Sequence, residues 1–401
     1  MRTRLQETPI SSGLENVTTI AYMMKWYPRE TVEAAIEACG NETLRSRQLP
    51  MDLMFYHLVM WGLNRKDSAT EALEKLLAGA KFIYGRPIGP VPARSAIVQA
   101  RQKLGDAPLR TVFEQRCKPL AAPDTPGAFF REWRLTALDG CLMNVADSKQ
   151  NEIFGRPSNQ NATPAAYPQI RMVCLGECGT HAIFEAEFGG YGDSESVLAK
   201  KVLSKLKPDM LCLMDRLFFG YSLWRLADST GAALLWRVKS NTKLEPVELL
   251  PDGSYTAHYY PSARDHENRD GDPILVRVVD CERRSEKPRK TENMKLVTNI
   301  MNPADASADE LARLYCQRWE IELVYGELKT RLNENQVYLK SNLPETVRQE
   351  LWGLLLAHYI VRAVIFEAAT STRRKLDPDD ISFIGTVNVL RREIGSGDFS
   401  P

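Results

Sequence analysis

The strongest constraint on the fold is the order in which strand-like and helix-like segments follow one another between residues 128 and 342. Short apolar runs bounded by glycine, proline or aspartate are typical of buried strands, and the segments between them have helical periodicity. Strands joined through a helix lie parallel, whereas strands joined by a short turn form an antiparallel hairpin. In chain order the segments are strands at 133–139, 169–175 and 181–188, a helix at 194–206, a strand at 210–214, a helix at 219–228, a strand at 233–238 and a long helix that begins near residue 307.

This order predicts an α/β protein with a ribonuclease H-like core. A segment at about residues 239–299 interrupts the order, and the strand-like runs inside it predict a β-rich insertion. Residues from about 16 to 118 have helical periodicity and are followed by a linker rich in proline and alanine at 119–127. We therefore expect an N-terminal helical domain at 1–118, the core domain at 128–342 and a C-terminal helical segment at 343–401.

Composition bounds the class of protein only loosely. The chain has 401 residues and 44% hydrophobic content, enough to bury a sizeable core, and its 52 basic residues can gather on one face although the net charge is only +1. Eight scattered cysteines predict a reduced, cytoplasmic protein, and five unpaired histidines argue against a histidine metal centre. His358, Arg362 and Glu367 interrupt the apolar run at 351–369, which predicts a buried helix and no membrane span.

The long helix carries four polar side chains at regular spacing. A capping-box pattern at residues 307–310 predicts where it begins. Tyr315, Arg318, Glu322 and Lys329 follow at offsets that place them within about 60° of one another on an ideal helix. We therefore expect all four to project from one face.

Three acidic residues occupy the places where this fold brings carboxylates together. Asp139 is predicted to end the first strand and Asp215 the fourth, and Glu322 lies on the helix expected to pack against the sheet. Clustered carboxylates repel one another unless cations neutralise them, and oxygen ligands suit Mg²⁺ or Mn²⁺. Two such ions about 3.5–4 Å apart form a clamp for phosphoryl transfer. A turn-forming aspartate or a solvated helix face explains each acid taken alone, but the three together favour a metal-dependent phosphodiester chemistry.

A family resemblance rests on these same residues. The spacing Tyr-x₂-Arg-x₃-Glu-x₆-Lys resembles the YREK signature of DDE transposases of the insertion-element-4 family. The Leu-Asp-Gly around Asp139 and the Met-Asp-Arg around Asp215 resemble the first two acidic motifs of that family. The resemblance covers roughly residues 20–390.

The resemblance implies a cut-and-paste DNA transposase of a bacterial insertion element. It implies that Asp139, Asp215 and Glu322 bind two Mg²⁺ ions, which Mn²⁺ can replace. It also implies that side chains near these acids contact DNA, namely Tyr315, Arg318, Lys329 and Arg216. By the same resemblance, residues 1–118 bind the DNA ends, and the protein acts as a homodimer on double-stranded DNA, both terminal inverted repeats and target, in the bacterial cytoplasm at the nucleoid.

Two alternatives stay open at this stage. One is a ribonuclease H-like nuclease that cuts without joining, and the other is a non-catalytic DNA-binding derivative that inhibits transposition. Leu217 stands where the family usually has glycine, and we expect this to alter the turn after Asp215. The chain ends at Pro401, earlier than expected, and a missing C-terminal segment would weaken dimerisation or end binding.

The predicted helix at 93–104 carries a further group of basic residues. Arg94, Arg101 and Lys103 are interpreted as a solvated basic face, with DNA contact as the alternative.

Overall fold

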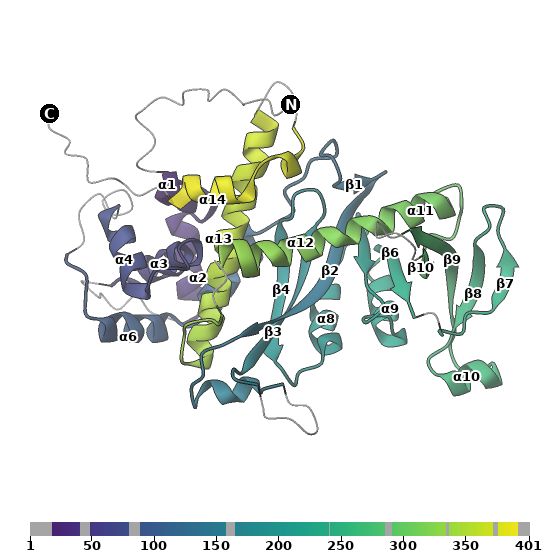
Figure 1. The fold of residues 1–401 in the computed structure, drawn as a ribbon, viewed down its shortest axis with the longest axis horizontal. Coiled ribbons are helices and arrows are strands. Elements are labelled where there is room, and N and C mark those ends of the chain that lie inside the picture. The colour runs from purple at the N-terminus through teal and green to yellow at the C-terminus, as the bar shows by residue number, and fades with distance from the viewer. Residues whose placement is uncertain are drawn as a thin grey trace.

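One mixed β-sheet runs through the molecule and carries helices on both faces (Figure 1). The structure is a computed structural model that describes residues 18–40, 49–79, 89–157, 165–239, 241–284, 291–333, 337–371 and 376–391. The order of the strands along the sheet is β4-β3-β2-β5-β6-β10-β9-β8-β7, and β1 pairs with β2. The strands are β1 (Phe129–Phe130), β2 (Trp133–Asn144), β3 (Gln169–Glu177), β4 (Ile183–Gly190), β5 (Met210–Met214), β6 (Ala233–Val238), β7 (Pro246–Leu249), β8 (Tyr255–Tyr259), β9 (Ile274–Arg284) and β10 (Thr291–Thr298).

The first five strands of this order form the predicted ribonuclease H-like core. β4, β3 and β2 pair antiparallel, and β2, β5 and β6 pair parallel. The connection into β5 passes through α8 (Glu195–Leu203), and the connection from β5 to β6 passes through α9 (Tyr221–Asp228). Parallel strands need such crossover connections, which usually contain a helix. The predicted fold class is confirmed.

The inserted segment extends this same sheet. β10 pairs antiparallel with β6, and β9, β8 and β7 follow outward from it. A short helix, α10 (Ala263–Asn268), lies between β8 and β9. The insertion therefore lengthens the central sheet at its β6 edge, at the right in Figure 1.

Side chains alternate between the two faces of the sheet, as the period of a strand requires. In β5, Leu211 and Leu213 join the core beneath the long helix, whereas Cys212 and Met214 join the core beneath α8 and α9. The central strand β5 is apolar at every position because both faces of the sheet are covered there.

The long helix is helical throughout but is not one regular α-helix. Ser307 and Glu310 form the predicted capping box at its start. The segment then contains α11 (Ala308–Leu314), a 3₁₀ turn (Tyr315–Arg318), α12 (Trp319–Gly326) and a π turn (Glu327–Leu332). The prediction of one ideal helix is wrong in this respect, because its winding tightens at Tyr315 and loosens at Glu327.

The N-terminal helices pack against the last long helix, α13 (Pro344–Ser371). Its contact with α3 (Met51–Leu63) is close: a Cβ at Gly62 would lie 2.3 Å from the carbonyl oxygen of Gly353, so only glycine fits there. The remaining helices are α1 (Thr18–Trp26), α2 (Arg29–Ala38), α4 (Ala69–Ala78), α6 (Arg94–Leu104), α7 (Ala107–Arg116) and α14 (Phe383–Arg391), with 3₁₀ turns at Asn151–Phe154 and Pro378–Asp380.

Within the described residues, α13 is the one helix long and apolar enough to cross a membrane. Of its most apolar window, 78% is buried inside the protein. The prediction of a buried core helix is therefore confirmed.

Candidate active site

Asp139 and Asp215 lie side by side on neighbouring parallel strands. Leu138 pairs with Met214, so each acid directly follows one member of the same pair. Alternation along the strands turns both acids toward the face covered by α12. Asp139 does not end its strand as predicted, because β2 continues to Asn144 through antiparallel pairing with β3.

The long helix brings three of its predicted site residues to these strands. The Tyr315 hydroxyl donates a hydrogen bond to the Met214 carbonyl oxygen at 3.2 Å, next to Asp215. The Arg318 guanidinium donates to Glu322 Oε1 at 2.8 Å, and it also interacts electrostatically with Asp139. The Glu322 side chain is 37% exposed, so its carboxylate lies at the rim of the site.

Lys329 and Arg216 lie at the two ends of this group. Lys329 hydrogen-bonds the thiol of Cys141, which shares its strand face with Asp139. Arg216 is exposed beside Asp215. Leu217 is 69% exposed and does not have a left-handed backbone, so the turn after Asp215 does not require the glycine that the family usually has there.

The electrostatic environment of Asp139 favours a cation. The pKa of Asp139 is raised to about 6, because burial and the carboxylates of Glu322 and Glu195 outweigh the lowering effects of the Gly140 amide and Arg318. A positive ion beside Asp139 would remove the cost of ionising this buried carboxyl group.

The donor set fits a hard divalent ion in its chemistry, because all three candidate ligands are carboxylates. The three carboxylates do not form a closed set of ligands around one position. No three His, Cys, Asp or Glu side chains of the described ranges are grouped closely enough to hold one ion. Arg318 lies among the acids and pairs with Glu322.

Two supporting contacts at this site were not predicted from the sequence. The Tyr325 hydroxyl donates to the Asp139 carbonyl oxygen, and Tyr325 lies one helical turn after Glu322, a spacing that the sequence does show. On the opposite sheet face, Glu195 pairs with Arg171 beneath Gly140, where an added Cβ would lie 2.8 Å from Glu195 Oε1.

A buried ionic cluster holds the helix just beyond the site. Glu327, in the π turn, accepts hydrogen bonds from Arg362 and from His358 Nε2 at 3.0 Å, and lies 3.4 Å from His181 Nδ1. Burial alone would raise the pKa of Glu327, but the hydrogen bonds from His181 and His358 and the charge of Arg362 hold it far below the usual value.

The interpretation of the basic helix at 93–104 is wrong for one residue. Arg101 is 5% exposed, because α6 turns it inward against the start of α13. It donates hydrogen bonds to Ser341 Oγ at 3.0 Å and to the Thr346 carbonyl oxygen at 2.9 Å. Arg94 and Lys103, on the same helix, are exposed as expected.

Fold and site together define a ribonuclease H-like enzyme. Family models match the chain in two parts: the insertion element 4 transposase N-terminal domain at residues 17–114 and the transposase DDE domain at residues 134–360. The second match covers more than half of the chain, which belongs to the insertion element 4 family of DDE transposases. It is an enzyme of DNA transposition, and enzymes of this family use divalent metal ions.

The chain is also similar to two bacterial proteins and to one solved structure. The chain is 29% identical over 370 residues to the transposase InsG for insertion sequence element IS4 of Escherichia coli K12, covering 90% of this chain and 80% of that protein. It is 28% identical over 225 residues to the putative transposase InsZ of the same strain, covering 55% of this chain and 73% of that protein. A piggyBac transposase synaptic complex with hairpin DNA is similar with a TM-score of 0.48 and 14% identity, over 95% of this chain and 80% of that one.

Proposed function

We propose that Asp139, Asp215 and Glu322 hold two divalent ions, Mg²⁺ or in its place Mn²⁺, at which DNA strands are cut and joined. The observation that carries this proposal is that Asp139 and Asp215 are neighbours on β2 and β5, each following one member of the paired residues of these parallel strands. Glu322 lies on the helix that covers the same face of the sheet. When bound, such ions activate a water or a 3′-hydroxyl and stabilise the leaving oxygen.

The polar residues around the acids are suited to bind the DNA strand. Arg318 Nε has no hydrogen-bond partner among the described residues, so a phosphate oxygen that reached it would satisfy this donor. Lys329 and exposed Arg216 flank it and would neutralise the adjoining phosphates. Tyr315 fastens the helix to the end of β5 and so holds Arg318 over the acids.

The reaction has two phosphodiester steps. Water attacks the phosphorus at the element end and releases a 3′-hydroxyl. That 3′-oxygen then attacks a phosphorus of the target DNA, forming one phosphorus–oxygen bond while the target's own 3′-oxygen leaves. We infer that two copies of the chain pair the two ends in a synaptic complex and that the protein works in the cytoplasm at the nucleoid.

A strand-cleavage assay tests this proposal. The full chain is incubated with labelled duplex taken from the DNA that flanks the gene, with Mg²⁺, with Mn²⁺ or with EDTA. We expect cleavage and joined or hairpin products that need the metal and are lost in Asp139→Asn. The matched control is Glu248→Gln, on exposed β7 of the insertion, which should behave as wild type. Cleavage without joining would indicate a nuclease, and tight binding without cleavage would indicate an inhibitor of transposition.

A further inference from the structure

The backbone of Asp139 lies where β2 passes the end of its parallel partner. β5 ends at Met214, which pairs with Leu138, so Asp139 and the following residues of β2 pair with β3 alone among the described strands. The Tyr325 hydroxyl donates a hydrogen bond to the Asp139 carbonyl oxygen at this point. A helix side chain therefore supports β2 where the sheet supports it from one side only.

One peptide group connects Tyr325 to the carboxylate of Asp139. The Asp139 carbonyl group and the Gly140 amide belong to the same planar peptide. Its oxygen accepts the hydrogen bond from Tyr325, and its N–H donates to Asp139 Oδ1 at 2.8 Å. A rotation of this peptide would move the carboxylate, and the Tyr325 hydroxyl opposes that rotation.

Tyr325 is itself held firmly between helix and sheet. The residue is 6% exposed, and burial raises its pKa, so the hydroxyl stays protonated and remains a donor. Four residues earlier on the same helix face, Ile321 packs over Gly176 of β3, where an added Cβ would lie 2.9 Å from Ile321 Cδ1. The helix is thus fixed to the sheet one residue before Glu322 and again three residues after it.

This attachment sets the separation of two candidate metal ligands. Glu322 and Tyr325 lie within one turn of α12, so the position of Glu322 relative to Asp139 depends on that turn and on the hydrogen bond at its end. The carboxylates of Asp139 and Glu322 repel each other, which favours their moving apart when no cation is bound. The contact made by Tyr325 resists that movement.

We propose that Tyr325 is a positioning residue for the divalent ions, because its hydroxyl holds the Asp139 carboxylate at a fixed place relative to Glu322. This inference rests on the proposed function, since it takes these acids to be metal ligands. Tyr325 touches no reacting atom in this assignment and acts through the backbone of Asp139. Removing a group that orients a metal ligand typically weakens metal binding or activity by about 10- to 100-fold.

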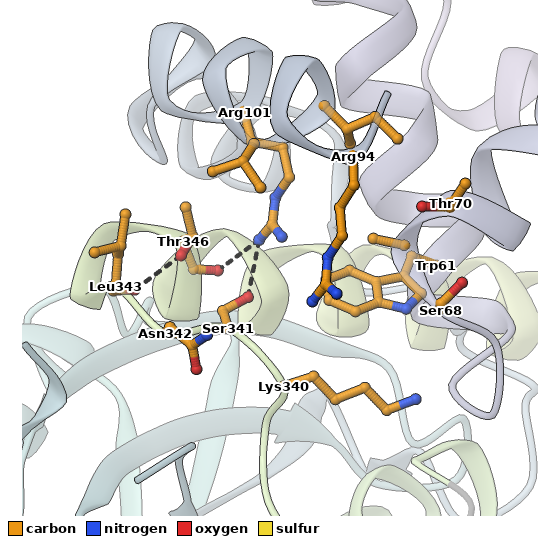
Figure 2. A pocket seen from close by; sticks show the side chains of 13 residues that line it. Trp61, Ser68, Thr70, Arg94, Arg101, Lys340, Ser341, Asn342, Leu343 and Thr346 are labelled. Atoms are coloured by element: carbon orange, nitrogen blue, oxygen red, sulfur yellow. Dashed lines mark hydrogen bonds between the residues drawn. The ribbon is translucent and has the colours of Figure 1, made fainter. Parts of the chain in front are cut away.

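The test removes the hydroxyl group and keeps the ring. Tyr325→Phe is compared with Tyr56→Phe, because the buried Tyr56 hydroxyl also donates to a backbone carbonyl oxygen, that of Tyr27 at 2.7 Å. A second control, Thr346→Val, removes the buried hydroxyl that donates to the Leu343 carbonyl oxygen at 2.9 Å where α13 begins (Figure 2). Each control loses one buried hydrogen bond outside the candidate active site.

Mn²⁺ binding to the full chain is measured from the electron paramagnetic resonance signal of the free ion. The binding that Asp139→Asn abolishes is assigned to the site. We expect Tyr325→Phe to bind this Mn²⁺ about tenfold more weakly and both controls to match wild type. Cleavage of duplex from the DNA that flanks the gene should need about tenfold more Mn²⁺ in Tyr325→Phe, whereas binding of that duplex in EDTA should be unchanged.

Two results would overturn the positioning role. One is an affinity of Tyr325→Phe for Mn²⁺ equal to that of Tyr56→Phe. The other is a loss of duplex binding in EDTA as large as the loss of Mn²⁺ affinity, because a general distortion of the site would then explain both. Melting temperatures of the three hydroxyl variants, measured without metal, establish that each is folded at the temperature of the assay.

Cleavage measured on the same samples separates this inference from the proposed function. Cleavage that requires metal and Asp139, with Mn²⁺ binding indifferent to the Tyr325 hydroxyl, leaves the proposed function standing and removes the positioning role. Mn²⁺ binding that requires Asp139 and weakens in Tyr325→Phe, without any cleavage of DNA, does the reverse.

Discussion

Two glutamates five residues apart on the same helical segment have opposite environments. Glu322 lies at the rim of the candidate site, is 37% exposed and has Arg318 as its ion-pair partner. Glu327 is 1% exposed and is bound by Arg362 and His358. The first belongs to a group of acids in which the pKa of Asp139 is raised, whereas the pKa of the second is lowered.

The comparison distinguishes Glu322, whose group of acids is suited to bind a ligand, from Glu327, whose contacts stabilise the fold. Negative charge at Asp139 is only partly compensated inside the protein, so an external cation gains by binding there. Negative charge at Glu327 is compensated by groups from α13 and from His181 of the β3–β4 turn. That cluster anchors the π turn, and with it the segment that carries Glu322 and Lys329.

The largest expected effect is the loss of DNA cleavage when Asp139 is replaced. Asp139→Asn keeps the size of the side chain but removes a metal ligand, and we expect cleavage to fall by roughly 10³-fold or more. Single-turnover cleavage at saturating Mg²⁺ measures this loss. Activity within a few-fold of wild type would remove Asp139 from the site.

The second effect is on stability and concerns the compensated group. Glu327→Gln leaves Arg362 buried with no carboxylate, and we expect the free energy of unfolding to fall by about 3 kcal/mol. Urea denaturation followed by circular dichroism measures it. A change below about 1 kcal/mol would mean that Glu327 does not anchor the fold.

The third effect is a pH dependence that arises from Asp139. Its folded-state pKa, about 6, is above the unfolded value, so its contribution to stability is present at low pH and is lost as pH rises through about 6. In EDTA we expect the free energy of unfolding to fall by about 3 kcal/mol as pH rises from about 4 to above 6.

Asp139→Asn should abolish the part of the pH dependence that is centred near pH 6. Burial also raises the pKa of Glu320, to about 7, so a component nearer neutral pH should persist in Asp139→Asn and vanish in Glu320→Gln. A divalent ion should oppose the loss, because it binds the ionised carboxylate. Unfolding profiles of wild type and Asp139→Asn that coincide at every pH would contradict the assignment.

The smallest effect is the stability change in Glu322→Gln. Its ion pair with Arg318 is a partly exposed pair one helical turn apart, and we expect a change below about 1 kcal/mol. The same denaturation series checks it. A loss as large as that of Glu327→Gln would erase the distinction between the two glutamates.

Local signals in the sequence were sufficient for several of the elements, and they also picked out the candidate acids that the proposed function uses. β5 and β6 were predicted with their observed bounds, and the capping box at Ser307 and Glu310 forms as predicted. These features depend on side chains within a few residues of one another, which a single sequence displays. The spacing of the four polar residues likewise predicted that they would project from one face of the long helix.

Contacts between residues distant in the sequence determined where β2 ends and which way Arg101 points. β2 passes Asp139 because β3 pairs with it, and Arg101 turns inward because α13 supplies its acceptors. The sequence by itself determined the order of elements and the positions of the acids, since periodicity and capping are local. Only the tertiary structure decided that Glu327 is fully compensated and Asp139 only in part, because the charges that stabilise a buried carboxylate come from other elements of the fold.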